Sequence, residues 1–260
     1  MLKKRLIPKL QMKHSGFGSR PILVTTQRFG QAIQVGDPVS QAKIYQDQAA
    51  DELIFLNLEP ERISKEALFE TLRRAAEQIF MPLTVGGGID SVEDFRILLQ
   101  SGADKVSINT AALENEKLIS EASHIFGTQC VVVSIDYKIT SDGLAKVISH
   151  GGKKETQWTL KEWAMECERR GAGELLITSI DRDGTKQGLD IAHTRMVTEC
   201  VSIPVIAAGG CGVASHFVQG LNVGGASAIS AGTYFCLQDQ NLMQCRAHIK
   251  NAGIEIRMKQ

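Results

Sequence analysis

The sequence predicts a single α/β domain over residues 1–260, a (β/α)8 TIM barrel built from two half-barrel repeats. Three observations favour this fold. Short β-rich runs alternate with stretches of helical composition along the chain, which is typical of a parallel sheet. There are eight such runs in 260 residues, the usual size of this kind of barrel. Several runs recur at one fixed spacing, which indicates an internal duplication.

The expected strands are marked by apolar and β-branched residues. In chain order they cover residues 5–10, 52–58, 82–88, 105–109, 130–136, 174–181, 204–210 and 227–232. Two helix starts are well defined, since Asp37 precedes a proline and Thr159 stands three residues before Glu162, the spacing of a capping box. Residues 138–157 depart from the pattern, because their Asp-Gly and Gly-Gly turns predict a hairpin inserted after the fifth strand.

The duplication relates the two halves of the chain residue by residue. DELIFLNLEP aligns with GELLITSIDR, and MPLTVGGGI aligns with IPVIAAGGC, so that Gly88 and Gly210, for example, lie 122 positions apart. The repeat pairs strands two, three and four with strands six, seven and eight. The first strand then pairs with VVVSIDYK, and Gln11 corresponds to Asp136. One half therefore ends its first strand in an amide and the other in a carboxylate.

Composition narrows the function to small-molecule or protein partners. The 29 basic and 29 acidic residues balance, so the chain lacks the electrostatic pattern of a nucleic-acid-binding protein. Its six cysteines include no C-x-x-C pair, which favours reduced thiols over disulfides or a metal site. We expect no metal and no cofactor. No apolar run reaches the length of a membrane span, and we expect a cytoplasmic protein.

Glycine pairs at the carboxyl ends of the strands predict two phosphate sites. Gly88 with Asn109 and Thr110 forms one candidate cradle, and Gly210 with Ala231 and Gly232 forms the repeat-related one. Backbone N–H groups at such positions can close on an anion. A glycine after a strand is by itself commonly a turn, but the duplication strengthens the joint interpretation. A ligand with a phosphate at each end would fit this symmetry.

A carboxylate stands between the two cradles. Asp136 shares a strand face with Val132 and Ser134, so its side chain should point into the barrel mouth. There it could act as a general acid or base on the middle of a bound ligand, with Gln11 opposite. The alternative is a helix cap or a loop hydrogen bond, and we favour the catalytic interpretation.

Four charged residues stand at the opposite ends of their strands. Arg5, Glu52, Lys105 and Glu174 begin the first, second, fourth and sixth strands. Two acids and two bases at one level would form a salt-bridged ring across the barrel floor. Spacing alone favours a structural role, because the amino-terminal face of such barrels usually serves stability.

The motifs DELIFLNL, TVGGGI, GADKVSINTAA, GAGELLITSIDRDGTKQG and GDPV resemble the cyclase (HisF-type) subunit of imidazole glycerol phosphate synthase over nearly the whole chain. The resemblance implies a bisphosphate substrate, a glutaminase (HisH-type) partner that docks on the barrel floor as a heterodimer, and ammonia passing up through the barrel. It also assigns residues. Gly88, Asn109 and Thr110 would bind one phosphate; Asp183, Gly184, Gly210 and Ala231 would contribute to the other; Arg5, Glu52, Lys105 and Glu174 match an ammonia gate; and Asp104 matches the glutaminase interface.

The chain departs from the family pattern in its first strand. The family's catalytic aspartate in a C-L-D-V-K-D-G type motif is replaced by Gln11 in KLQMKHSG. The lysine of the first loop falls at Thr25, and the aspartate that ends the second strand is Asn57. Lys9 occupies an inward position that is usually small or apolar. Its ammonium is expected either to extend toward Asp136 and the mouth or to serve as a new functional base.

These departures shape the expected function. The ammonia route is intact while half of the acid/base pair is missing, and this combination favours a paralogue of the lyase or ammonia-transferring synthase type. We expect it to serve amidation of a cell-surface (lipopolysaccharide) sugar together with a third, sugar-amidating enzyme. Two alternatives are a genuine cyclase of histidine biosynthesis and a non-catalytic barrel that activates a glutaminase. A lysine Schiff-base aldolase is a more distant alternative, since only Lys138 stands near an acid at a strand end.

Overall fold

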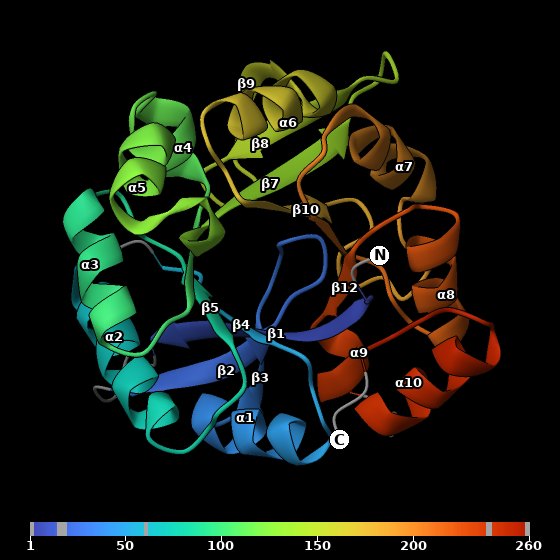
Figure 1. Cartoon of the computed structure of the whole chain (residues 1–260), viewed down its shortest axis with the longest axis horizontal. Coiled ribbons are helices and arrows are strands. Elements are labelled where there is room, and N and C mark those ends of the chain that lie inside the picture. The colour runs from blue at the N-terminus through green and yellow to red at the C-terminus, as the bar shows by residue number, and fades with distance from the viewer. Residues whose placement is uncertain (1–2, 15–19, 60–61, 238–240, 258–260) are drawn as a thin grey trace.

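The computed structural model describes residues 3–14, 20–59, 62–237 and 241–257. Within them, eight parallel strands surround a central axis, and the predicted (β/α)8 barrel is confirmed (Figure 1). The sheet closes because β10 pairs with both β11 and β7. The barrel strands are β1 (Arg5–His14), β4 (Leu53–Asn57), β5 (Leu83–Gly86), β6 (Lys105–Ile108), β7 (Val131–Ile139), β10 (Glu174–Ser179), β11 (Val205–Ala208) and β12 (Ala228–Ala231).

Helices form the outer ring of the barrel (Figure 1). Asp37 caps the first of them by accepting a hydrogen bond from the Ser40 backbone N–H at 2.8 Å, and Thr159 and Glu162 form a reciprocal capping box at the start of the sixth. The helices are α1 (Pro38–Asp47), α2 (Arg62–Ala76), α3 (Val92–Gln100), α4 (Thr110–Glu114), α5 (Leu118–Phe126), the 3-10 turn η1 (Thr128–Cys130), α6 (Leu160–Arg169), α7 (Ile191–Cys200), α8 (Ala214–Asn222), α9 (Thr233–Cys236) and α10 (Leu242–Asn251).

The apolar residues of the strands form two separate cores. Outward-facing side chains pack against the helices in one large cluster. Inward-facing side chains form a small second cluster on the barrel axis, which consists of Ile7, Ile54, Val132, Leu176, Ile206, Ala208 and Ala228. This division follows from the two-residue period of a strand, because alternate residues face the axis and the helices. The second cluster is called the apolar layer below.

The two halves of the barrel repeat the spacing of the sequence. β5 begins at Leu83 and β11 at Val205, and β4 and β10 contain Leu53 and Leu175 at equivalent positions, each pair 122 residues apart. Equivalent strands therefore end at the same level of the barrel, as the aligned motifs predict.

Four further strands extend the sheet beyond the barrel. β8 (Ala145–Ser149) and β9 (Lys154–Thr159) continue antiparallel from the end of β7, in the segment where a hairpin was expected. β2 (Pro21–Thr25) and β3 (Ile33–Gly36) form a second antiparallel extension on β1 that the sequence pattern did not predict. The stretch expected to be a loop around Thr25 is thus a strand that pairs with Gln11 through His14.

The structure also shows the state of the cysteines and the character of the helices. All six cysteines carry free thiols. Among the described residues, none of the helices is both long enough and apolar enough to cross a lipid bilayer.

Candidate active site

The barrel mouth gathers four polar side chains that the sequence places far apart. Lys9 and Gln11 reach it from β1, Asp136 from β7, and Asp183 from the turn after β10. All four are buried, with at most 9% of each residue exposed. Lys9 and Gln11 share the inward face of β1 with Ile7, which belongs to the apolar layer. A deep polar site therefore lies directly above an apolar barrel interior.

Asp136 is the titratable group at the centre of this site. The pKa of its carboxyl is raised from 3.8 to about 7, chiefly by burial. The nearby charge of Asp183 also raises this pKa, whereas Lys9, Asn109 and Thr178 lower it. Asn109 Nδ2 donates a hydrogen bond of 2.7 Å to Asp136 Oδ2, which fixes the orientation of the carboxyl. A group with a pKa near 7 can both accept and donate a proton at neutral pH.

Lys9 extends from below toward the acids of the mouth. Its Nζ lies 3.7 Å from Asp183 Oδ1, and its charge also acts on Asp136. Asp183 in turn accepts a hydrogen bond from the Thr26 hydroxyl at 3.3 Å. The Lys9 side chain therefore extends toward the mouth, which is one of the two expectations for this residue. Its ion-pair partner is Asp183.

The first candidate cradle lies at the ends of β5 and β6. Gly87 and Gly88 both have positive φ, 98° and 76°, and a Cβ at Gly87 would lie 2.0 Å from the Asn57 carbonyl oxygen, so only glycine fits there. Asn109 and Thr110 follow β6 at the start of α4. The hairpin turn after β8 reaches this point, where the His150 backbone N–H donates to Thr110 Oγ1 at 3.0 Å.

The second candidate cradle lies across the mouth. A pocket there is lined by Lys9, Gln11, Asp183, Gly184, Gly209, Gly210, Cys211, Ser230, Ala231, Gly232, Thr233 and Tyr234. Gly184 and Gly210 have φ values of 69° and 112°. A Cβ at these positions would approach the carbonyl oxygens of Thr26 and Gly188 to 2.3 and 2.1 Å, so glycine is required at both. The residues that the sequence and the resemblance assigned to this phosphate lie together around one pocket.

Sequence reasoning missed Ser230 and Thr233, which also line this pocket. Ser230 points inward from β12, with a fully buried hydroxyl that has no hydrogen-bond partner among the described residues. Thr233 Oγ1 lies 2.7 Å from Thr25 Oγ1, which joins the end of β2 to the pocket rim. The inward periodicity of AISAG could have identified Ser230. The contact between the two threonines depends on β2, which the pattern did not reveal.

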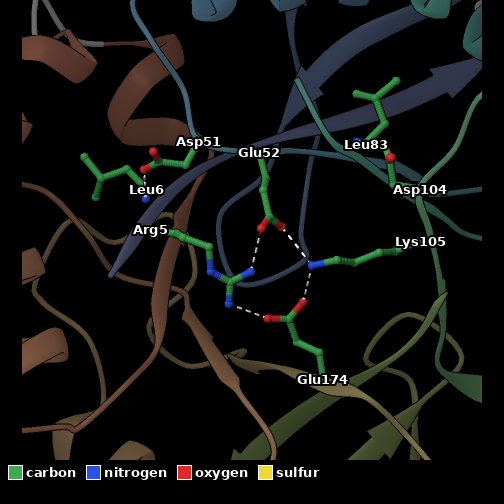
Figure 2. A network of polar contacts seen from close by, with 8 residues as sticks. All are labelled: Arg5, Leu6, Asp51, Glu52, Leu83, Asp104, Lys105 and Glu174. Atoms are coloured by element: carbon green, nitrogen blue, oxygen red, sulfur yellow. Dashed lines mark hydrogen bonds and ion pairs between the residues drawn. The ribbon is translucent and has the colours of Figure 1, made fainter. Parts of the chain in front are cut away.

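The four charged residues at the barrel floor form a closed ring (Figure 2). Arg5 contacts Glu52 at 2.7 Å and Glu174 at 2.5 Å through different guanidinium nitrogens. Lys105 Nζ contacts the same two carboxylates at 3.0 and 2.8 Å. Each acid therefore bridges both bases, and the ring joins β1, β6 and β10 with Glu52, which directly precedes β4.

Electrostatics hold the ring in its charged state. Burial opposes ionisation of both Arg5 and Glu52. Its effect is outweighed by the partners, because Glu174 and Glu52 raise the pKa of Arg5, and Arg5 and Lys105 lower the pKa of Glu52. The ring is thus a network of ion pairs in which no charge lacks a partner.

Asp104 lies beside the ring on the exposed floor (Figure 2). Its Oδ2 accepts a hydrogen bond from the Leu83 backbone N–H at 2.8 Å, which holds the carboxylate at the start of β5. On the other side, the buried Asp51 accepts from the Leu6 backbone N–H at 2.8 Å and pairs with Arg246 at 3.0 Å. The first carboxylate is accessible to a partner at the floor, whereas the second is structural.

Three layers therefore stack along the barrel axis: the charged floor ring, the apolar layer and the polar mouth. Among the described residues, no cluster of three or more His, Cys, Asp or Glu side chains could hold a metal ion. The arrangement suits acid/base chemistry on a phosphorylated ligand.

Comparison with known proteins decides the family. The family model described as histidine biosynthesis protein matches residues 6–239. A Prochlorococcus marinus (strain MIT 9313) protein, provisionally named imidazole glycerol phosphate synthase subunit hisF2, is 52% identical over the full length of both chains. The imidazole glycerol phosphate synthase subunit HisF of Anoxybacillus flavithermus (strain DSM 21510 / WK1) is 42% identical over 99% of this chain and 100% of its own. The chain belongs to the HisF-type cyclase family.

The first strand of this HisF-type chain carries Gln11 and Lys9 into the mouth. Where the resemblance implies a catalytic aspartate, Gln11 supplies an amide that cannot exchange a proton near neutral pH. The cation Lys9 enters the same space from one inward position below. Asp136 is left as the titrating group with a pKa near neutrality.

Proposed function

We propose that this chain is the synthase subunit of a glutamine amidotransferase complex, which receives ammonia from a HisH-type glutaminase and incorporates it into a phosphorylated substrate. The observation that carries the proposal is the order of the three layers: a charged ring at the floor, an apolar layer, and a polar mouth flanked by two anion cradles. The names of the relatives support the same assignment.

The three layers suit the passage of a neutral molecule such as ammonia. Ammonia can cross an apolar interior at little cost, whereas an ammonium ion would lose its hydration there. The floor ring is where a glutaminase would dock, with Asp104 at the accessible edge. At the mouth, Asp136 would transfer protons as ammonia reacts, and the cradles would hold phosphate groups on either side of it.

We favour a cell-surface (lipopolysaccharide) sugar as the final acceptor of the nitrogen. A positioned acid or base usually contributes about 10² to 10⁴ in rate, and Gln11 removes one of the two expected in this family. Such a loss is too large for a dedicated cyclase of histidine biosynthesis. The barrel would then deliver ammonia to a nucleotide sugar or to the enzyme that amidates it, and this enzyme would be a third component of the complex.

The proposal is tested by following the nitrogen. The chain, its glutaminase partner and a candidate sugar-amidating enzyme are supplied with [amide-15N]glutamine in excess unlabelled ammonium salt. We expect a product that retains the 15N label, and a loss of retention in the Arg5→Met variant, where the floor ring is open. The proposal fails if omission of the chain leaves product formation unchanged, or if label in the product is fully diluted by the salt.

A genuine imidazole glycerol phosphate cyclase is the second candidate, favoured by the near-neutral pKa of Asp136 and by the name of the 42% identical relative. Expression in a histidine auxotroph that lacks its own cyclase separates the two functions. Growth without histidine supports the cyclase, and absence of growth with stable expression supports the paralogue.

A scaffold that only activates a glutaminase is a third candidate. The Asp136→Asn variant addresses it directly, because the amide keeps the shape of the side chain and removes its titration. Unchanged product formation by the complex would show that the barrel mouth does no chemistry. A rate lower by about 10² or more supports a catalytic mouth.

A further inference from the structure

The ammonium of Lys9 faces the pocket of the second cradle without a hydrogen bond to any described residue. The residue is 4% exposed, although lysine is almost never buried unless it is paired. Among the described residues it has one ion-pair partner, Asp183 Oδ1 at 3.7 Å, and no hydrogen-bond acceptor. That separation exceeds the 2.7–3.2 Å of an ordinary hydrogen bond. Three N–H donors are therefore left unused at the inner end of the second cradle.

A second unused donor lines the same pocket. The hydroxyl of Ser230 is buried and has no hydrogen-bond partner among the described residues. The register of β1 and β12 pairs Ile7 with Ser230, so Lys9 lies one inward position further along the neighbouring strand. Two donors without a hydrogen bond to the described residues therefore face one pocket, the Lys9 ammonium and the Ser230 hydroxyl, and they indicate a ligand that supplies acceptors.

The charge of the pocket specifies what kind of acceptor is needed. Among the described residues that line it, Lys9 is the single cation and Asp183 the single acid. Without Lys9 the lining would be net negative and would repel an anion. With Lys9 it is neutral, and its glycine backbone at Gly184, Gly210 and Gly232 allows close approach.

We propose that Lys9 is a ligand-binding residue, which donates from inside the barrel to a phosphate group held in the second cradle. Its ammonium supplies charge-assisted hydrogen bonds to the innermost phosphate oxygens, and the Ser230 hydroxyl adds a neutral donor. This inference rests on the proposed function, which places a phosphate in each cradle. It adds that the second cradle of this chain draws its positive charge from the barrel interior.

The test is a titration of the 15N-labelled chain with inorganic phosphate, at constant ionic strength maintained with chloride and followed by NMR. The amide signals of Gly210 and Gly232 report on the second cradle, and those of Gly88 and Thr110 report on the first. Removing a hydrogen bond to a charged group costs about 1.5–3 kcal/mol. We therefore expect Lys9→Met to weaken phosphate binding about 10- to 100-fold at the second cradle. The first cradle should keep its affinity.

A rescue variant separates the charge of Lys9 from its packing. Thr25 Oγ1 lies 2.7 Å from Thr233 Oγ1 at the pocket rim, so Thr25→Lys brings an ammonium to the same pocket from above. Lys9→Met combined with Thr25→Lys should recover most of the lost affinity at the second cradle. In the unmodified protein, the side-chain Cε and Nζ signals of Lys9 should shift with the same dissociation constant as the Gly232 amide, a measurement that requires no variant.

The outcomes are distinguishable. Equal phosphate affinity at the second cradle in the unmodified and Lys9→Met proteins overturns the inference, as does a Lys9 side-chain signal that ignores phosphate while Gly232 responds. Absence of any phosphate response at either cradle in the unmodified protein overturns the phosphate sites of the proposed function itself.

Discussion

Replacing Asp136 by asparagine should make the protein more stable at alkaline pH. The carboxyl has a pKa of 3.8 before burial and about 7 in the folded chain, so the folded state binds the proton more tightly. Above pH 7 the native protein therefore carries a buried carboxylate at a cost. A pKa difference of this size corresponds to about 4 kcal/mol, which is a large share of the 5–15 kcal/mol stability of a typical domain.

The sign of the effect sets the experiment. Below pH 4 the group is protonated in both states and contributes nothing. Between pH 4 and 7 the unmodified protein loses stability as pH rises, and above pH 7 the full difference is present. Asparagine removes this titration but can still accept the hydrogen bond that Asn109 donates. We expect Asp136→Asn to exceed the unmodified protein by up to about 4 kcal/mol at pH 8 and by far less at pH 5.

The assay is urea unfolding at pH 5 and pH 8, monitored by fluorescence and circular dichroism. Asp104→Asn is the matched control, because it removes a carboxylate from the exposed floor and keeps the acceptor for Leu83. It should shift the unfolding midpoint little and equally at both pH values. An Asp136→Asn protein with the same stability change at pH 5 and pH 8, or one destabilised at pH 8, would refute the account of the mouth.

Three further predictions concern the floor and the first cradle. Arg5→Met leaves two buried carboxylates sharing one lysine and should cost about 3 kcal/mol in urea unfolding at pH 7; a loss below about 1 kcal/mol would mean that the ring is not a coupled network. Because the pKa of Glu52 is lowered from 4.5, the contribution of Glu52 to stability is present above pH 4.5 and should disappear as the pH falls below that value. This loss of stability is best measured in the Asp136→Asn variant, where the opposing titration of Asp136 is absent. Gly87→Ala places a Cβ 2.0 Å from a backbone oxygen and should destabilise the chain by more than about 2 kcal/mol. The control Gly143→Ala, at φ 82° with nothing within 4 Å of its Cβ, should cost about 1 kcal/mol. Equal losses of stability in the two variants would contradict the steric explanation.

The barrel strands were predictable because their patterns are local. Runs such as CVVVSID and PVIAAGG are rich in apolar and β-branched residues, and the strands that they form are buried on both faces. The 122-residue repeat supported assignments such as PVIAAGG with a second copy. The β2–β3 extension was not predictable in the same way. β3 is short and mostly exposed, and it is a strand only because β2 pairs with both it and the end of β1.

The site was predictable in its membership and less so in its contacts. Inward periodicity placed Lys9, Gln11 and Asp136 in the mouth, and the level of the charged residues anticipated the floor ring. The pairing of Lys9 with Asp183 joins residues far apart in the chain, so it depends on which strand ends face each other. The unused Ser230 hydroxyl requires the packed barrel to be recognised.

We propose that the mouth keeps its phosphate cradles while the missing carboxylate at Gln11 has changed the acceptor. Ammonia-dependent conversion of the bisphosphate precursor of histidine, by the purified chain with saturating ammonium salt, tests it most directly because no glutaminase is needed. We predict measurable binding of the bisphosphate with turnover about 10² to 10⁴ below that of an ordinary cyclase. Turnover in the usual enzyme range of about 1 to 10³ s⁻¹ would contradict the account and identify a working cyclase with a substitute for the missing carboxylate.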